Sequence, residues 1–268
     1  MIIDGHVHVW PDKIAKRALG SPGDGLQRFG DGTVASAAET MRAAGVDRSI
    51  CLAVADTPER LESANRFVGS LDPELFIGFG SVHPARTPEE NVASLRDNGL
   101  RGVKVHPLFQ GFALDDPRLY DVLAALEGEF AAVFHVGPEH PGDPRGALAT
   151  PAMIREIALA FPRLDVVAAH LGGYHAFDEA LEAVNGLDVH LDTSWPPGIA
   201  SLDPARVRAA IASHGPERVV FATDWPMADP ATEIASIRAL GFSDEDTDAI
   251  LGGNFARLLK LPTTTETT

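Results

Sequence analysis

Two histidines separated by a single residue lie near the start of the chain, in the segment "DGHVH" at residues 4–8. His6 and His8 end the first apolar run, where a buried strand would ordinarily carry more valine or isoleucine. Because side chains alternate along a strand, both imidazoles point to the same face. This spacing makes the pair a candidate for binding something at the end of the strand.

Residues of the same chemical type end several later apolar runs. They are His83, His106, His135, His170 and Asp224. Imidazoles combined with one carboxylate suit Zn²⁺ or another divalent transition metal, and a catalytic site keeps one position open for water. A metal held there would lower the pKa of its water to about 7. An isolated H-x-H segment is more often a hydrogen-bonded polar pair, but ligand-type residues at several separate strand ends favour a metal site.

The order of elements predicts how these residues meet. Apolar or β-branched runs occupy residues 2–9, 49–54, 76–82, 102–106, 131–136, 166–170, 187–192 and 219–224. Most are separated by segments with apolar residues three or four apart, several of which begin with Thr-Pro or Asp-Pro, a helix-start signal. Strands alternating with helices predict a single (β/α)8 barrel with its active site where the strands end. We expect this α/β domain over residues 1–262, a long loop at 10–32 and a disordered tail at 263–268.

Composition limits the class of protein and its partners. The 268 residues are 45% hydrophobic and 22% charged, with no apolar tract of membrane-spanning length. The formal net charge of −16 argues against a nucleic-acid partner. A single cysteine, Cys51, and no evident secretory signal favour a cytoplasmic protein that acts on a small molecule. The assembly is left open between a monomer and a homodimer.

Six segments, in this order, resemble the amidohydrolase superfamily, in its amidohydrolase-related branch of metal-dependent hydrolases and decarboxylases. They are "DGHVH" (4–8), "GVKVHP" (102–107), "FHVG" (134–137), "AAHLGG" (168–173), "FATDWP" (221–226) and "ILGGNFARLLKL" (250–261). The resemblance spans nearly the whole chain. It is specific for the superfamily but not for one reaction.

The resemblance implies a role for each matching residue. His6, His8, His135 and Asp224 would bind one metal ion, with zinc expected and manganese as the alternative. Asp224 would also accept a proton from the attacking water. His170 would be the base that orients this water or a further ligand, and His106 would polarise the substrate.

Lys104 raises a further alternative. Some branches of the superfamily carry a carboxylated lysine on strand four that bridges two metals, and Lys104 lies on that strand. His106 would stand nearer the mouth of the barrel, so we favour Lys104 as a cation that either contacts the metal ligands or faces the substrate. Trp225, Trp195 and Arg145 follow the ends of strands eight, seven and five and are candidate substrate contacts, with packing or surface charge as the alternative for each.

Hydrolysis of a small amide or lactone by a metal-activated water is the expected reaction, because "TDWP" resembles the strand-eight segment of lactonase-like members. The alternative is non-oxidative decarboxylation of a small aromatic or unsaturated acid. Familiar decarboxylases often carry an aromatic residue two positions after the strand-five histidine, where this chain has Gly137. A barrel that keeps its metal only for structure is a third alternative, but a closed structural site would need neither an open position nor a neighbouring base.

Overall fold

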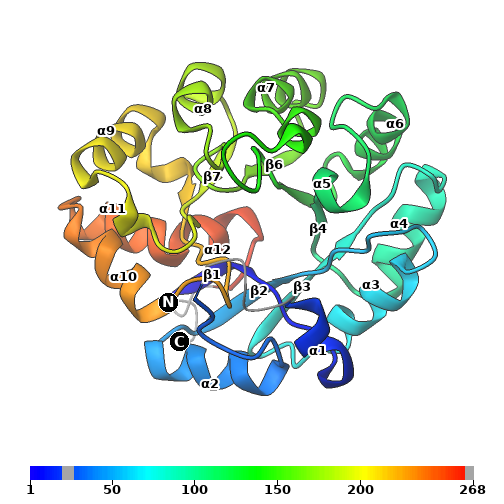
Figure 1. Cartoon of the computed structure of the whole chain (residues 1–268), viewed down its shortest axis with the longest axis horizontal. Coiled ribbons are helices and arrows are strands. Elements are labelled where there is room, and N and C mark those ends of the chain that lie inside the picture. The colour runs from blue at the N-terminus through cyan, green and yellow to red at the C-terminus, as the bar shows by residue number, and fades with distance from the viewer. Residues whose placement is uncertain (20–26, 263–268) are drawn as a thin grey trace.

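The protein is a barrel of eight parallel strands surrounded by helices (Figure 1). The computed structural model describes residues 1–19 and 27–262. The strands pair in sequence order and are β1 (Ile3–Val7), β2 (Arg48–Leu52), β3 (Phe76–Ser81), β4 (Gly102–Val105), β5 (Ala131–Phe134), β6 (Asp165–Ala168), β7 (His190–Asp192) and β8 (Val219–Val220). Backbone hydrogen bonds from Gly5 to Phe221 and from His8 to Trp225 join β1 to the chain after β8. The predicted (β/α)8 fold is therefore confirmed.

Helices connect successive strands around the outside of the barrel (Figure 1). The longer ones are α1 (Asp12–Ala18), α2 (Val34–Ala44), α3 (Leu61–Gly69), α4 (Pro88–Asp97), α6 (Pro117–Leu126), α7 (Pro151–Ala160), α8 (Phe177–Val184), α9 (Pro204–His214) and α10 (Pro230–Ala239). Shorter helical segments are α5 (Pro107–Gln110), η2 (Pro144–Leu148), η3 (Ile199–Ser201), η4 (Pro216–Arg218), α11 (Asp244–Asp248), η5 (Ala249–Gly253) and α12 (Asn254–Leu258). In the described ranges, no helix has the length and apolar character that crossing a membrane requires.

Several helices begin where the sequence predicted. Thr87, Asp116 and Thr150 each precede a proline, and each side chain accepts a hydrogen bond from a backbone N–H in the first turn of the helix that follows. Glu90 completes a capping box with Thr87. These caps satisfy N–H groups that an uncapped helix would leave unpaired.

The loop expected at residues 10–32 is partly helical, so the prediction was wrong for α1. This helix carries Asp12 in its first turn and Lys16 and Arg17 in its last, an arrangement that complements the helix dipole. Residues 20–26 of the expected loop and the tail expected at 263–268 lie outside the described residues.

Two apolar layers hold the barrel together. One lies between the strands and the outer helices, and the other fills the barrel interior with side chains such as Ile50, Phe79 and Val133. Phe255 of α12 joins the interior layer and lies so close to β1 that a Cβ on Gly5 would come within 2.0 Å of its ring. The C-terminal motif thus packs α12 against the barrel interior.

Most of the strands end earlier than their apolar runs suggested. His106, His135, His170 and Asp224 lie just beyond β4, β5, β6 and β8 rather than within them. Pro107 begins α5 directly after His106, while His170 and Asp224 both have a φ of 60°. A positive φ cannot continue a strand, so the chain turns at these residues, at the end of the barrel where active sites are built.

An irregularity in β1 makes room for the histidine pair. The register of β1 on β2 shifts between Asp4 and Val7. Ile3 packs in the barrel interior, and His6, three residues later, contacts Lys104, which is also fully buried. In a regular strand, residues three apart face opposite sides, so the shift is what lets both side chains enter the barrel.

Candidate metal centre

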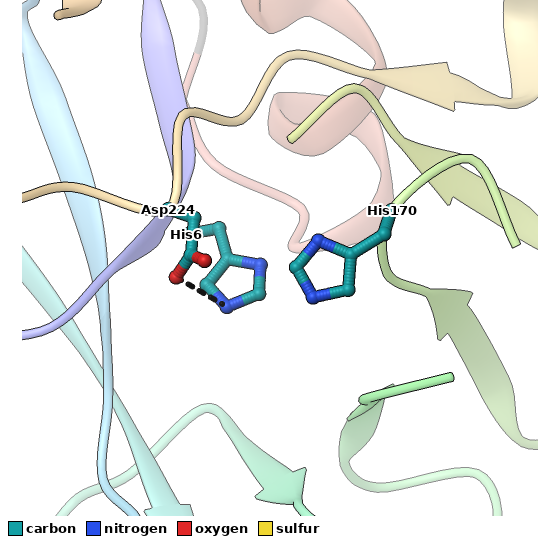
Figure 2. Close-up of side chains that lie close together, drawn as sticks. All are labelled: His6, His170 and Asp224. Atoms are coloured by element: carbon teal, nitrogen blue, oxygen red, sulfur yellow. Dashed lines mark ion pairs between the residues drawn. The ribbon is translucent and has the colours of Figure 1, made fainter. Parts of the chain in front are cut away.

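His6, His8 and Asp224 form a triangle of donor atoms at the end of the barrel. The Nε2 atoms of the two histidines lie 3.2 Å apart, and each lies 3.4 Å from Oδ1 of Asp224. His6 comes from β1 and Asp224 from the turn after β8, which the barrel brings together (Figure 2). The structure thus brings these three predicted ligands to one point.

Protein oxygens hold the other ring nitrogens of the two histidines. His6 Nδ1 lies 2.8 Å from Oδ2 of Asp192, at the end of β7, and His8 Nδ1 lies 3.2 Å from the carbonyl oxygen of Leu52. Both partners accept hydrogen bonds, so the protons reside on the Nδ1 atoms. Each Nε2 then presents a lone pair to the triangle, as in carboxylate–histidine pairs that orient metal ligands.

His170 and His135 extend the cluster on the opposite side. His170 faces His6 and Asp224 (Figure 2), and one ligand atom from each of the three lies within 4.8 Å of the others. Nε2 of His170 lies 3.0 Å from Nδ1 of His135. His135 is therefore connected to the triangle through His170, and it also belongs to a second group with His106 and Glu139.

The donor atoms fit a transition metal. Zinc bonds to histidine nitrogen and carboxylate oxygen are about 2.0–2.2 Å long, which places neighbouring ligand atoms about 3–3.5 Å apart. The three separations among His6, His8 and Asp224 fall in this interval. Nitrogen donors with one carboxylate oxygen suit Zn²⁺ or Mn²⁺ better than Ca²⁺, which prefers oxygen ligands alone.

Burial sets the protonation of the cluster. It lowers the pKa of His6, His106 and His135 well below the usual 6.5, and neighbouring cationic or imidazole groups lower it further. Burial alone would raise the pKa of Asp224, but His6 and His8 outweigh it and bring the value to about 2. Neutral imidazoles around an ionised carboxylate are the protonation states that metal binding needs.

Lys104 is a buried cation in direct contact with the triangle. Its side chain is fully buried, and Nζ lies 3.1 Å from Nε2 of His6. Burial lowers the pKa of Lys104 to about 8, against the opposing influence of Asp192 and Asp224. Lys104 therefore places a positive charge beside the ligand atoms, and this charge is lost as the pH rises through about 8.

His106 lies at the edge of the cluster and packs flat against His135. The ring centroids are 4.0 Å apart with an interplanar angle of 10°. Gln110 of α5 fixes the backbone here, because its Oε1 accepts the N–H of His106 while its Nε2 donates to the carbonyls of Ala55 and Val82. One amide side chain thus ties together the chain following β2, β3 and β4.

The remaining predicted substrate contacts lie in different surroundings. Trp225 is 1% exposed and lies against Gly30, and Trp195 is buried edge-on against Tyr174 and Phe177. Arg145 makes a bidentate ion pair with Asp143. Direct contact of these three side chains with a substrate stays a prediction.

The sequence reasoning missed four polar residues that organise the cluster. Ser194 donates to Asp192 and lies 2.9 Å from Nδ1 of His170, and Asp4 accepts the hydroxyl and backbone N–H of Thr223. Gln110 and Glu139 are the other two. Asp4 and Ser194 lie within two residues of His6 and Asp192, so proximity in "DGHVH" and "LDTS" was an available signal. Nothing comparable marked Glu139, which reaches His106 from the loop after β5.

Comparisons with known structures agree with the fold. An uncharacterized TIM-barrel protein from Bordetella bronchiseptica is 21% identical, with a TM-score of 0.75 and coverage of 97% of this chain and 98% of that chain. A dihydroxybenzoic acid decarboxylase from a Polaromonas species, solved with manganese and an inhibitor, is 17% identical, with a TM-score of 0.71 and 97% of each chain covered. A probable 2-pyrone-4,6-dicarboxylic acid hydrolase from Acinetobacter baumannii is 16% identical, with a TM-score of 0.65 and coverage of 97% and 99%.

The sequence itself gives the family. A search among curated proteins finds no match. The sequence model of the amidohydrolase family, in contrast, matches residues 3–261 and so includes every residue of the cluster. With the eight-stranded barrel and the histidine–aspartate cluster at its end, this match shows that the chain belongs to the amidohydrolase family.

Proposed function

We propose that this protein is a metal-dependent hydrolase that attacks the carbonyl carbon of a small amide or lactone. The proposal rests on the position and charge of Asp224. Its carboxylate lies 3.4 Å from two histidine nitrogens, and its pKa is held at about 2. An ionised carboxylate in this position can serve both as a metal ligand and as a proton acceptor. His170, beside it, supplies a neutral imidazole.

His6, His8, His135 and Asp224 would hold one ion. Zinc is the metal we propose, and manganese is the alternative because the Polaromonas decarboxylase was solved with it. When bound, the ion would supply Lewis-acid polarisation and activation of a water molecule. Asp192 and Leu52 keep the Nε2 atoms of His6 and His8 available for it.

The protein side chains then divide the proton transfers among them. Water adds to the carbonyl carbon, Asp224 takes its proton, and the carbon–oxygen or carbon–nitrogen bond breaks as that proton passes to the leaving atom. His170 orients the water, since Ser194 holds its Nδ1 and leaves Nε2 facing the cluster. His106 binds the substrate beside the reacting carbonyl, and Lys104 stabilises negative charge that develops on the substrate.

Decarboxylation of a small acid is the second candidate, because a decarboxylase is among the proteins with the same fold. Gly137 weighs against it. A Cβ at this position would lie 2.1 Å from the carbonyl oxygen of Tyr174, so this backbone has no room for the aromatic residue of familiar decarboxylases. We therefore favour hydrolysis, with a small-molecule substrate in the cytoplasm as the expected setting.

A substrate panel tests the choice between the two reactions. Metal-loaded protein is assayed against lactones and amides for acid release and against carboxylic acids for carbon dioxide release. We expect lactone or amide turnover, and a fall of about 100–10,000-fold in kcat for Asp224→Asn, with metal content retained by the three histidines. Asp121→Asn, an exposed change on α6, serves as the matched control. Carbon dioxide release without lactone or amide turnover would reverse the assignment.

A further inference from the structure

His106 differs from the other histidines of the cluster in its hydrogen bonds. His6, His8, His135 and His170 each have one ring nitrogen held by a protein oxygen, from Asp192, Leu52, Gly137 and Ser194 respectively. Within the part of the chain that the structure describes, Nδ1 of His106 has no hydrogen-bond partner, and Nε2 comes no closer than 3.9 Å to the carboxylate of Glu139, although the residue is only 5% exposed. The ring therefore keeps hydrogen-bonding capacity that no protein group uses and that is available to a partner from outside the protein.

Only one of its two ring nitrogens can meet that partner. Nδ1 is sealed from solvent, and the faces of the ring pack against His135, at 4.0 Å between centroids, and Phe109, at 4.2 Å. Nε2 lies 3.9 Å from Oε1 of Glu139, which is too long for a direct hydrogen bond. The nearby carboxylate favours the tautomer that carries its proton on Nε2. A donor and an acceptor therefore lie side by side, with a gap between them.

A second metal ion fits this gap poorly. The lone pairs of an imidazole lie in the plane of its ring, and the planes of His106 and His135 are 10° apart. Lone pairs of two stacked, nearly parallel rings do not converge on one ion. The group His106, His135 and Glu139 is therefore better suited to hydrogen bonding than to coordination.

We propose that His106 and Glu139 form a subsite for a hydroxyl group of the substrate, beside the metal centre. A hydroxyl can accept from Nε2–H of His106 and donate to Glu139 at once, whereas a carbonyl uses only the first group and an ammonium only the second. Arg145, the nearest cation to this carboxylate along the loop, is already bound to both oxygens of Asp143. Resting on the proposed function, this inference narrows the substrate to a lactone or amide with a hydroxyl next to the reacting carbonyl.

Paired lactones provide the first test. The metal-loaded enzyme is assayed with α-hydroxy-γ-butyrolactone and γ-butyrolactone, and the ratio of their kcat/KM values is corrected for the uncatalysed rates. We expect a preference of at least about 10-fold for the hydroxylated lactone, because a hydrogen bond to a charged group is worth this much or more. Glu139→Leu should reduce the preference below about 3-fold, whereas Glu156→Leu, an exposed change on α7, should leave it intact.

Binding of unreactive analogues separates this inference from the proposed reaction. Cyclopentanone and 2-hydroxycyclopentanone have no bond to hydrolyse, and their Kd values are measured by calorimetry on the metal-loaded wild type and on Glu139→Leu. Tighter binding of the hydroxyketone that depends on Glu139 supports the subsite even if no lactone is hydrolysed. Equal binding of the two ketones, or a lactone preference that Glu139→Leu leaves unchanged, would overturn the subsite while leaving hydrolysis intact.

Discussion

Asp192 and His6 form a buried pair in which Oδ2 of the carboxylate lies 2.8 Å from Nδ1 of the imidazole. The second oxygen of Asp192 accepts the backbone N–H of His170 and the hydroxyl of Ser194. One carboxylate at the end of β7 therefore holds the His6 side chain from β1 and the backbone of His170 in the turn after β6. Asp192 is thus a positioning residue for two histidines of the cluster.

Replacing Asp192 by Asn should weaken metal binding. The amide cannot accept from both His6 and Ser194 with the strength of a carboxylate, so the His6 ring loses its fixed tautomer and orientation. We expect metal affinity to fall about 10–100-fold, as for other partners of ligating histidines. Competition against a chelator of known affinity measures the change. An affinity equal to that of the control Asp121→Asn would refute this role.

Glu233 of α10 should make stability depend on pH. Its side chain is 2% exposed and accepts the N–H of Ile199, and burial raises its pKa from 4.5 to about 7. Between these two pH values the folded chain keeps a proton that the unfolded chain has lost. The free energy of unfolding therefore decreases as pH rises from about 4.5 to 7, and the loss is complete above pH 7.

The variant Glu233→Gln removes this titration and keeps an oxygen for Ile199. The free energy of unfolding of Glu233→Gln minus that of the wild type should increase by about 2–3 kcal/mol as the pH rises from 5 to 8. Urea unfolding at the two pH values gives the difference directly. The exposed variant Glu156→Gln is the control, and a stability difference between Glu233→Gln and wild type that stays constant with pH would contradict the expectation.

Gln110→Leu should damage both stability and catalysis. It leaves the buried N–H of His106 and the carbonyls of Ala55 and Val82 without their partner. We expect a loss of about 2–4 kcal/mol in urea unfolding, together with a lower kcat in the variant that remains folded. Loss of stability with unchanged kcat would show that Gln110 does not position His106 for the reaction.

The fold was predictable because each strand carries its own local signal. β-branched and apolar runs mark all eight strands, and Thr-Pro and Asp-Pro pairs mark the starts of α4, α6 and α7. The strand ends were not predictable in the same way. At His170 and Asp224 the chain turns with a positive φ that suits the packing of the barrel mouth rather than any local preference of these residues.

The candidate site was predictable in part, for the same physical reason. His6, His8 and Asp224 follow from strand order, because the ends of parallel strands meet at one side of a barrel. Glu139 and Gln110 could not be predicted, because their contacts depend on where a loop and a one-turn helix fold back over the strands. The positions of Glu139 and Gln110 beside His106 therefore come only from the structure.

Gly137 provides a last test, because its backbone conformation supports His135. It has a φ of +92°, its N–H donates to Ala149, and its carbonyl lies 3.2 Å from Nε2 of His135. In Gly137→Ala, the new Cβ would lie 2.1 Å from the carbonyl oxygen of Tyr174, so the backbone must shift.

Gly142→Ala is the matched control, since Gly142 has a φ of +84° but no atom within 4 Å of an added Cβ. We expect a loss of about 2–4 kcal/mol for Gly137→Ala and about 1 kcal/mol for Gly142→Ala in urea unfolding. Metal affinity should fall only in Gly137→Ala, and equal losses in the two variants would mean that Gly137 contributes only its φ and does not hold His135 in place.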